Sequence, residues 1–100
     1  MSLETVSYRK IGMNGTLEGT LTGVLALRRA EGTAAVMVGD SRVIVRTLRF
    51  HLQASTLPDG HRCRLEDQLL DADGQKWVIT GFRLATLGTR WAVETQEKIG

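Results

Sequence analysis

The chain has few of the residues that most often carry chemistry. Its 100 residues include one cysteine, Cys63, and two histidines, His51 and His61. A lone cysteine cannot form an internal disulfide, which is typical of a protein kept in a reducing compartment. Zinc sites use three or four protein ligands at recognisable spacing, and the sequence contains no such set. We therefore expect no catalytic constellation, no metal and no cofactor.

Two rival interpretations of these residues stay open. His61 and Cys63 are two residues apart, so on a strand both side chains would point to one side, as in a metal site. His51 and Cys63 could instead act as base and nucleophile, although no third group is identifiable that would orient them. A small metal-dependent or cysteine enzyme is the rival that these residues keep open.

Long hydrophobic runs are also absent. No apolar run approaches the roughly 20 residues of a membrane helix, and the N-terminus lacks a basic-then-apolar signal pattern. Hydrophobic residues make up 42% of the chain, which is enough for a compact core. We expect residues 1–100 to form a single β domain without a membrane partner, located in the cytoplasm and not secreted.

What the chain does contain is a succession of short alternating segments with β-branched and aromatic residues. The predicted strands are 5–11, 16–27, 34–38, 42–50, 75–80 and 91–94. Turn residues separate them at 12–15, Glu31-Gly32, 39–41, Asp73-Gly74 and 86–89. One helical turn is expected over Gln53 to Leu57, because Pro58 disfavours its continuation. The pattern predicts a mainly β fold, a small antiparallel barrel or sandwich with at most one short helical turn.

The large aromatic residues are few, and three of them lie in the second half of the chain. Trp77, Phe82 and Trp91 fall in or beside the last two predicted strands. In a small β domain, tryptophans usually belong to the core. The alternative is that they anchor an interface, where tryptophan is enriched.

Charge is distributed unevenly, although the net charge of +2 is too small to indicate nucleic-acid binding by itself. Arginine, which is enriched at protein interfaces, outnumbers lysine by ten to three. An arginine-rich segment contains Arg42, Arg46, Arg49, Arg62 and Arg64. An acidic stretch follows it and contains Glu66, Asp67, Asp71 and Asp73. We expect these nine residues to form a subunit or partner interface.

Other interpretations of the charged residues remain. The arginines could lie on a solvated strand face and pair with neighbouring carboxylates, or they could bind phosphate. Few aromatics are present to stack on bases, which disfavours nucleic acid. The run Asp71-Ala72-Asp73-Gly74 mimics part of a calcium loop, but a bidentate glutamate is missing at the twelfth position, where Phe82 stands. That run therefore predicts a hairpin turn.

From Thr5 to Thr95, the chain resembles the small head–tail joining proteins of tailed phages and prophages, also called head-completion or adaptor proteins. The matching segments are Val6-Ser7-Tyr8-Arg9, Arg49 to Leu57, Pro58, Glu66-Asp67-Gln68-Leu69, Gly74 with Trp77-Val78-Ile79, and Arg90-Trp91-Ala92-Val93. The chain departs from that family in having Glu66 where glycine is usual and Trp77 where tyrosine is commoner. It is also short around residue 39.

The resemblance implies a structural protein of the virion, not an enzyme, that forms or joins a ring between portal and tail. Its partners would be copies of itself and neighbouring connector or tail proteins. It would be found in the host cytoplasm during assembly and then in the virion. A glycine-punctuated segment, 12–23 or 32–41, would project as a loop that orders on docking. The alternatives are a tail-end ring protein and a small nucleic-acid-binding barrel that uses the arginine-rich segment.

Overall fold

The protein is mainly β-structure, as the alternation predicts. The computed structural model describes residues 3–85 and 87–98. Its elements are β1 (Glu4–Ile11), β2 (Leu17–Val38), β3 (Ser41–Gln53), the 3-10 helix η1 (Ala54–Thr56), β4 (Gln68–Leu70), β5 (Lys76–Ala85) and β6 (Arg90–Glu97). The short helix falls where Pro58 predicts one helical turn. The turn expected at 86–89 includes Thr86, which lies outside the described residues.

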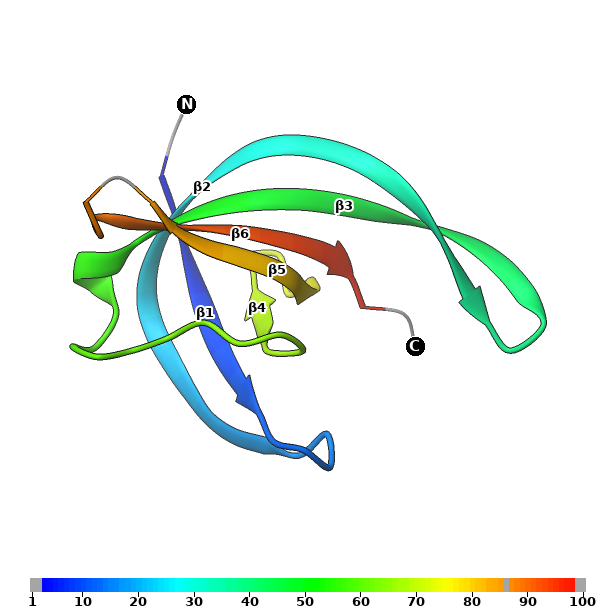
Figure 1. The fold of residues 1–100 in the computed structure, drawn as a ribbon, viewed down its shortest axis with the longest axis horizontal. Helices are drawn as coiled ribbons and strands as arrows, with labels where there is room; N and C mark the ends of the chain where they lie inside the picture. The colour runs from blue at the N-terminus through cyan, green and yellow to red at the C-terminus, as the bar shows by residue number, and fades with distance from the viewer. Residues whose placement is uncertain (1–2, 86, 99–100) are drawn as a thin grey trace.

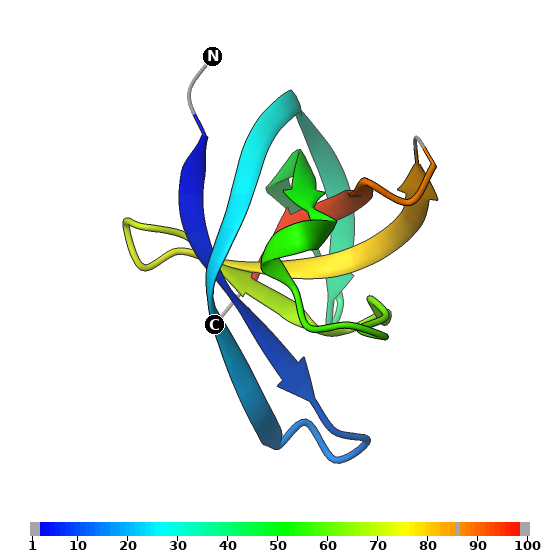
Figure 2. The ribbon, with the colours of Figure 1, turned by 90° about the vertical axis from the view of Figure 1, so that its left-hand side faces the viewer.

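The strands close into an antiparallel barrel in the order β1-β2-β3-β6-β5-β4 (Figure 1). The short strand β4 closes the ring by pairing on both edges. Leu69 lies opposite Tyr8 of β1 and opposite Trp77 of β5. Of the two architectures that the sequence allows, the barrel is therefore the one formed. Seen from one end, η1 lies across the mouth of this barrel (Figure 2), where it contacts β2 and β6.

Alternate residues of the strands fill the barrel. The core includes Val6, Tyr8, Val24, Ala26, Leu48, Phe50, Leu52, Leu69, Ile79 and Val93, each at most 2% exposed. Trp77 and Trp91 are 3% and 7% exposed, so the prediction that the tryptophans belong to the core is confirmed. Their burial removes large apolar surfaces from water and contributes much of the driving force for folding.

The turn expected at Glu31-Gly32 is wrong. β2 continues through these residues to Val38, and only its register against β3 shifts, between Arg28 and Glu31. Gly32 lies opposite Thr47, and a Cβ there would stand 3.1 Å from the Thr47 hydroxyl oxygen. The glycine thus permits a close approach beside a β-bulge instead of reversing the chain.

The far part of the β2–β3 hairpin leaves the barrel. β1 pairs with β2 only as far as Ala26, and β6 pairs with β3 only from Thr47 onward. Residues 33–46, which we call the arm, therefore form a two-stranded ribbon that projects beyond the barrel (Figure 1). Gly39, with φ of +62°, opens its tight turn. Of the two segments expected to project as a loop, 32–41 does project, but as part of a paired hairpin. The other, 12–23, consists of the turn after β1 and the start of β2.

Candidate functional site

Two carboxylates of the predicted interface are buried in the fold. The first is Asp67, which is only 1% exposed. Its Oδ2 accepts a hydrogen bond from the Tyr8 hydroxyl at 2.6 Å, and its Oδ1 accepts one from the Ile11 backbone N–H at 2.9 Å. The Arg64 guanidinium donates to both oxygens at 3.3 Å. Asp67 therefore ties the approach to β4 onto β1, where the barrel closes.

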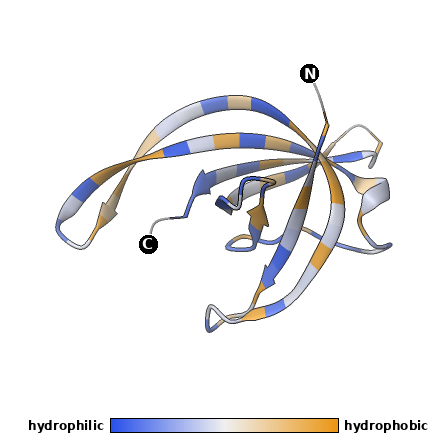
Figure 3. Cartoon of the chain, turned by 180° about the vertical axis from the view of Figure 1, so that it is seen from behind, coloured by the Kyte–Doolittle hydropathy of each residue, from blue (hydrophilic) through white to orange (hydrophobic). Residues whose placement is uncertain are grey.

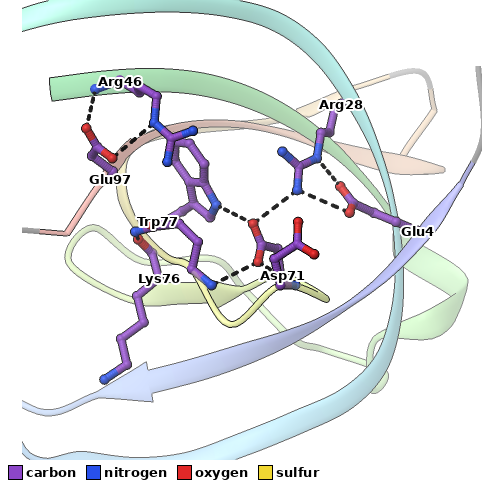
Figure 4. Close-up of polar contacts among 9 residues, drawn as sticks. Glu4, Arg28, Arg46, Asp71, Lys76, Trp77 and Glu97 are labelled. Atoms are coloured by element: carbon purple, nitrogen blue, oxygen red, sulfur yellow. Dashed lines mark hydrogen bonds and ion pairs between the residues drawn. The ribbon is translucent and has the colours of Figure 1, made fainter.

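The second buried carboxylate is Asp71, which organises the turn between β4 and β5 (Figure 4). Its Oδ1 accepts the backbone N–H groups of Asp73 at 3.0 Å and Gln75 at 2.9 Å. Its Oδ2 accepts Trp77 Nε1–H and Arg28 Nη2–H, each at 3.0 Å. This confirms the hairpin turn that Asp73-Gly74 predicts, with Gly74 at φ of +84°.

These hydrogen bonds set the protonation of Asp71. Burial favours its neutral form, but the bonds donated by Trp77, by the Gln75 and Asp73 backbone and by Arg28 outweigh burial. The pKa of Asp71 consequently lies below its ordinary value. A charged, fully paired carboxylate at this position stabilises the fold.

The buried positions of Asp67 and Asp71 correct the predicted interface. Both carboxylates are satisfied by donors of their own chain, so neither is available to a partner. Of the predicted acidic residues, Glu66 and Asp73 are exposed. A tryptophan close in sequence to an Asp-Gly turn is one signal that Asp71 is buried and accepts a hydrogen bond, because a buried indole N–H needs an acceptor. The sequence holds no comparable signal for Asp67.

Three of the five predicted arginines also pair within the chain. Arg46 binds Glu97 at 3.1 Å, and Arg49 binds Glu94, its direct cross-strand neighbour, at 2.6 Å. Arg64 binds Asp67 and, at 3.1 Å, Glu18. The interpretation as a solvated face whose arginines pair with nearby carboxylates describes these three. Arg42 and Arg62 form no ion pair with the residues that the structure describes.

The thiol and His51 of the rival enzyme have different surroundings in the structure. Cys63 is 2% exposed within the core, and burial raises the pKa of its thiol to about 12, which keeps it protonated. His51 instead lines a surface hollow with Leu27 and Gln53. Among residues 3–85 and 87–98, no three His, Cys, Asp or Glu side chains are grouped as metal ligands. No helix in these ranges is long and apolar enough to cross a membrane.

The arm carries apolar residues on both of its faces (Figure 3). Directly opposite residues of an antiparallel pair share a face. One face is formed by Ala34, Val36, Val43 and Val45. The other is formed by Ala35, Met37, Arg42 and Ile44. On the first face Val45 is buried and Ala34, Val36 and Val43 are half-buried. Met37 and Ile44 on the second face are 67% and 62% exposed, and Val38 at the tip is 46% exposed, so these three side chains stay in contact with water.

A second apolar surface lies at the other end of the molecule. Loop residues 60–62, residues 82–84 of β5 and Trp91 line a hollow of about 390 Å³, which we call the end hollow. Phe82 is 42% and Leu84 50% exposed, and Phe82 packs edge-on against Trp91 at 5.9 Å between ring centroids. The segments that line the end hollow and the arm tip lie toward opposite ends of the molecule, whose longest extent is 42 Å (Figure 1).

A third feature lies on the outer wall of the barrel, where Arg29, Arg83 and Arg90 surround His51. We call these four residues the basic strip. His51 lies opposite Ala92 of β6, and Ala92 lies opposite Arg83 of β5. Burial lowers the pKa of His51, and the nearby positive charges of Arg90, Arg29, Arg49 and Arg83 lower it further. Arg29, Arg83 and Arg90 form no ion pairs with other described residues.

Sequence reasoning missed the exposed apolar surfaces, because it did not predict the exposure of Phe82 and expected an unpaired loop in place of the arm. One available signal was that both faces of residues 42–50 carry apolar side chains. Neither protein-family models nor curated proteins give a match to the sequence. The arm and the end hollow are thus the surfaces from which a function has to be argued.

Proposed function

We propose that this chain is a structural virion-assembly protein of a tailed phage or prophage, which forms or joins a ring at the head–tail connection. The observation that carries the proposal is the arm, a projecting ribbon whose Met37, Val38 and Ile44 side chains its own chain leaves exposed. A lone two-stranded hairpin is at best marginally stable in water. Exposed apolar patches of this kind mark surfaces that partners cover.

The segments that resemble head–tail joining proteins also support the proposal, because they meet in space. Tyr8, from the first segment, donates its hydroxyl hydrogen to Asp67, from the segment before β4. Leu69 then pairs with Trp77 of the aromatic strand. Glu66, which stands where that family usually has glycine, has a φ of +72°, a backbone conformation that favours glycine.

The proposed role is non-enzymatic: the barrel acts as a rigid spacer, and the arm and end hollow make its contacts. Contacts between different surfaces of identical subunits close into a ring when the rotation between them permits. A ring at the tail end is the positional alternative, because it would use the same surfaces. Mixing the protein with isolated portal rings or tail rings distinguishes the two positions by which ring it binds.

The test is light scattering or sedimentation on the purified protein over a concentration series, alone and mixed with those rings. We expect a discrete higher-order species, or a complex with one ring. A variant with Met37→Ser and Ile44→Ser should lose that species while keeping the far-UV spectrum of the folded protein. A strict monomer that also ignores both rings would count against the proposal.

The basic strip favours one second candidate function, binding of a nucleic-acid backbone. Its unpaired arginines, Arg29, Arg83 and Arg90, replace the arginine-rich segment that the sequence indicates. Each phosphate neutralised lowers the logarithm of the binding constant by about 0.9 per tenfold rise in salt for duplex DNA. A steep salt dependence that flattens in Arg83→Ala would support this candidate. Binding that is weak and insensitive to salt would exclude it.

A further inference from the structure

We propose that the arm tip of one copy inserts into the end hollow of a second copy. This inference rests on the proposed function and specifies which surfaces the subunits use. The two surfaces differ in shape, since one is a projecting hairpin and the other is concave. The segments that form them lie toward opposite ends of the molecule (Figure 1). A contact between them therefore joins copies head to tail.

The two surfaces match in apolar character. The arm tip presents Met37 and Val38, which are 67% and 46% exposed. The end hollow presents Phe82 and Leu84, which are 42% and 50% exposed, over the edge of Trp91. A methionine side chain adapts to irregular hollows, and its sulfur interacts favourably with aromatic rings. Burying both sets at once would remove each from water.

The two surfaces also match in charge. Asp40 lies in the turn at the arm tip and forms no hydrogen bond or ion pair with the residues that the structure describes. Arg62 and Arg83 line the end hollow, and they likewise lack a partner there. A carboxylate on the inserted hairpin would pair with a guanidinium at the rim. Such pairs fix register and exclude wrong partners more than they add affinity.

Self-association through two identical surfaces fits the molecule less well. Two arms laid side by side would cover apolar side chains of the arm but would leave the end hollow uncovered. Two end hollows facing each other would oppose Arg62 and Arg83 to their own copies. Like charges across an interface disfavour this second arrangement. Only the head-to-tail contact covers both apolar surfaces and pairs their free charges.

Cysteine cross-linking tests the contact directly. In a Cys63→Ser background, one preparation carries Val38→Cys and a second carries Leu84→Cys; each is oxidised alone and then as a mixture. A head-to-tail contact predicts a disulfide-linked dimer in the mixture, at least about tenfold above either preparation alone. A dimer formed by the Val38→Cys preparation alone would indicate an arm-to-arm contact and overturn the inference.

A charge exchange gives a second readout that needs no oxidation. Asp40→Arg should weaken association by about tenfold, and Arg62→Asp introduced into the same chain should restore it. Asp73→Arg is the matched control, because it reverses an exposed acid away from both surfaces and should leave association unchanged. Unfolding curves of all variants confirm that each is folded, since these side chains are exposed.

The outcomes separate this inference from the proposed function. Assembly that persists without a mixture-specific disulfide and without sensitivity at Asp40 overturns the inference alone. If portal or tail rings bind the protein while both of these results stay negative, the arm contacts another virion protein. That outcome also overturns the inference. Absence of any assembly, with copies or with rings, overturns both. A mixture-specific disulfide together with the restored charge exchange establishes the contact.

Discussion

The two halves of the β2–β3 hairpin have the same secondary structure and very different surroundings. In the barrel half, Val24 and Phe50 are completely buried, because β1 and β6 extend the sheet on both sides and close it around a core. In the arm, Met37 and Ile44 are mostly exposed, because the ribbon has no further strand on either edge. The apolar side chains of the two halves differ in exposure because neighbouring strands flank only the barrel half.

This contrast separates two uses of apolar residues. Those in the barrel half remove surface from water within the chain and so contribute to its stability. Met37 and Ile44 of the arm remove little until something covers them. Polar residues divide in the same way: Asp71 is satisfied inside the turn that it organises, whereas Asp40 at the arm tip has no partner among the described residues. Barrel changes should therefore alter folding, and arm changes should alter assembly.

The strongest test of this contrast is Asp71→Ala. The change leaves the buried Trp77 indole N–H without its acceptor, removes a partner of Arg28 and weakens the turn before β5. Each buried donor left without a partner costs about 1–3 kcal/mol, so we expect a loss of about 3 kcal/mol in the free energy of unfolding. Urea unfolding measures it, with Asp73→Ala as the exposed control. A loss equal to that of the control would contradict the assignment.

A matched pair of valines in one strand gives the next largest effect. Val24→Ala removes two methyl groups from the core and should cost about 2 kcal/mol, including the cavity left behind. Val36→Ala makes the same chemical change in the arm and should cost less than about 0.5 kcal/mol. Urea unfolding of dilute protein, where association is absent, compares the two. Equal losses would mean that the arm belongs to the folding core.

Acid should weaken the barrel partly through Asp71. Its ordinary pKa is 3.8, and its pKa in the folded protein is lower. The stabilisation from its charge is therefore complete above about pH 4 and is lost as the pH falls through the folded value. Urea midpoints of the wild type and Asp71→Asn, compared from about pH 6 to about pH 2, should converge on the acid side. A constant difference over that range would show that the charge contributes nothing.

Much of the fold could be predicted from local sequence, because strands and turns are local features. Alternation located β1 and β3 to within a few residues. Asn14-Gly15 marked the turn between β1 and β2, and Asp73-Gly74 marked the turn between β4 and β5. The Glu31-Gly32 pair misled because glycine serves both in turns and where two backbones approach closely. Only the side chain of Thr47, across the sheet, distinguishes these two uses.

The candidate site was predicted less well, because it depends on contacts between distant parts of the chain. The donors of Asp67 and Asp71 include Tyr8 and Arg28, which are 59 and 43 residues away in sequence. No local pattern reveals that a carboxylate will meet such donors. The apolar faces of the arm resemble those of a buried strand for the same reason. Whether a strand finds neighbours is decided by the topology of the whole barrel.

The smallest effect concerns a strained residue beside one of these buried carboxylates. Glu66 has a φ of +72°, and its backbone N–H bonds to the Ile79 carbonyl at 3.0 Å, which holds it there. Glycine adopts this conformation without the steric cost of a Cβ, although it loses more entropy on folding. Glu66→Gly should therefore stabilise the protein by about 0.5–1 kcal/mol in urea unfolding.

The control for this change is Glu66→Ala, which removes the carboxylate but keeps the Cβ. If the backbone at residue 66 is strained, Glu66→Gly raises the free energy of unfolding and Glu66→Ala does not. Equal gains in both variants would trace the effect to the lost charge. A loss of stability in the glycine variant would mean that the backbone at residue 66 carries no strain that glycine relieves. The same substitution should leave association unchanged, because residue 66 lies in neither the arm nor the end hollow.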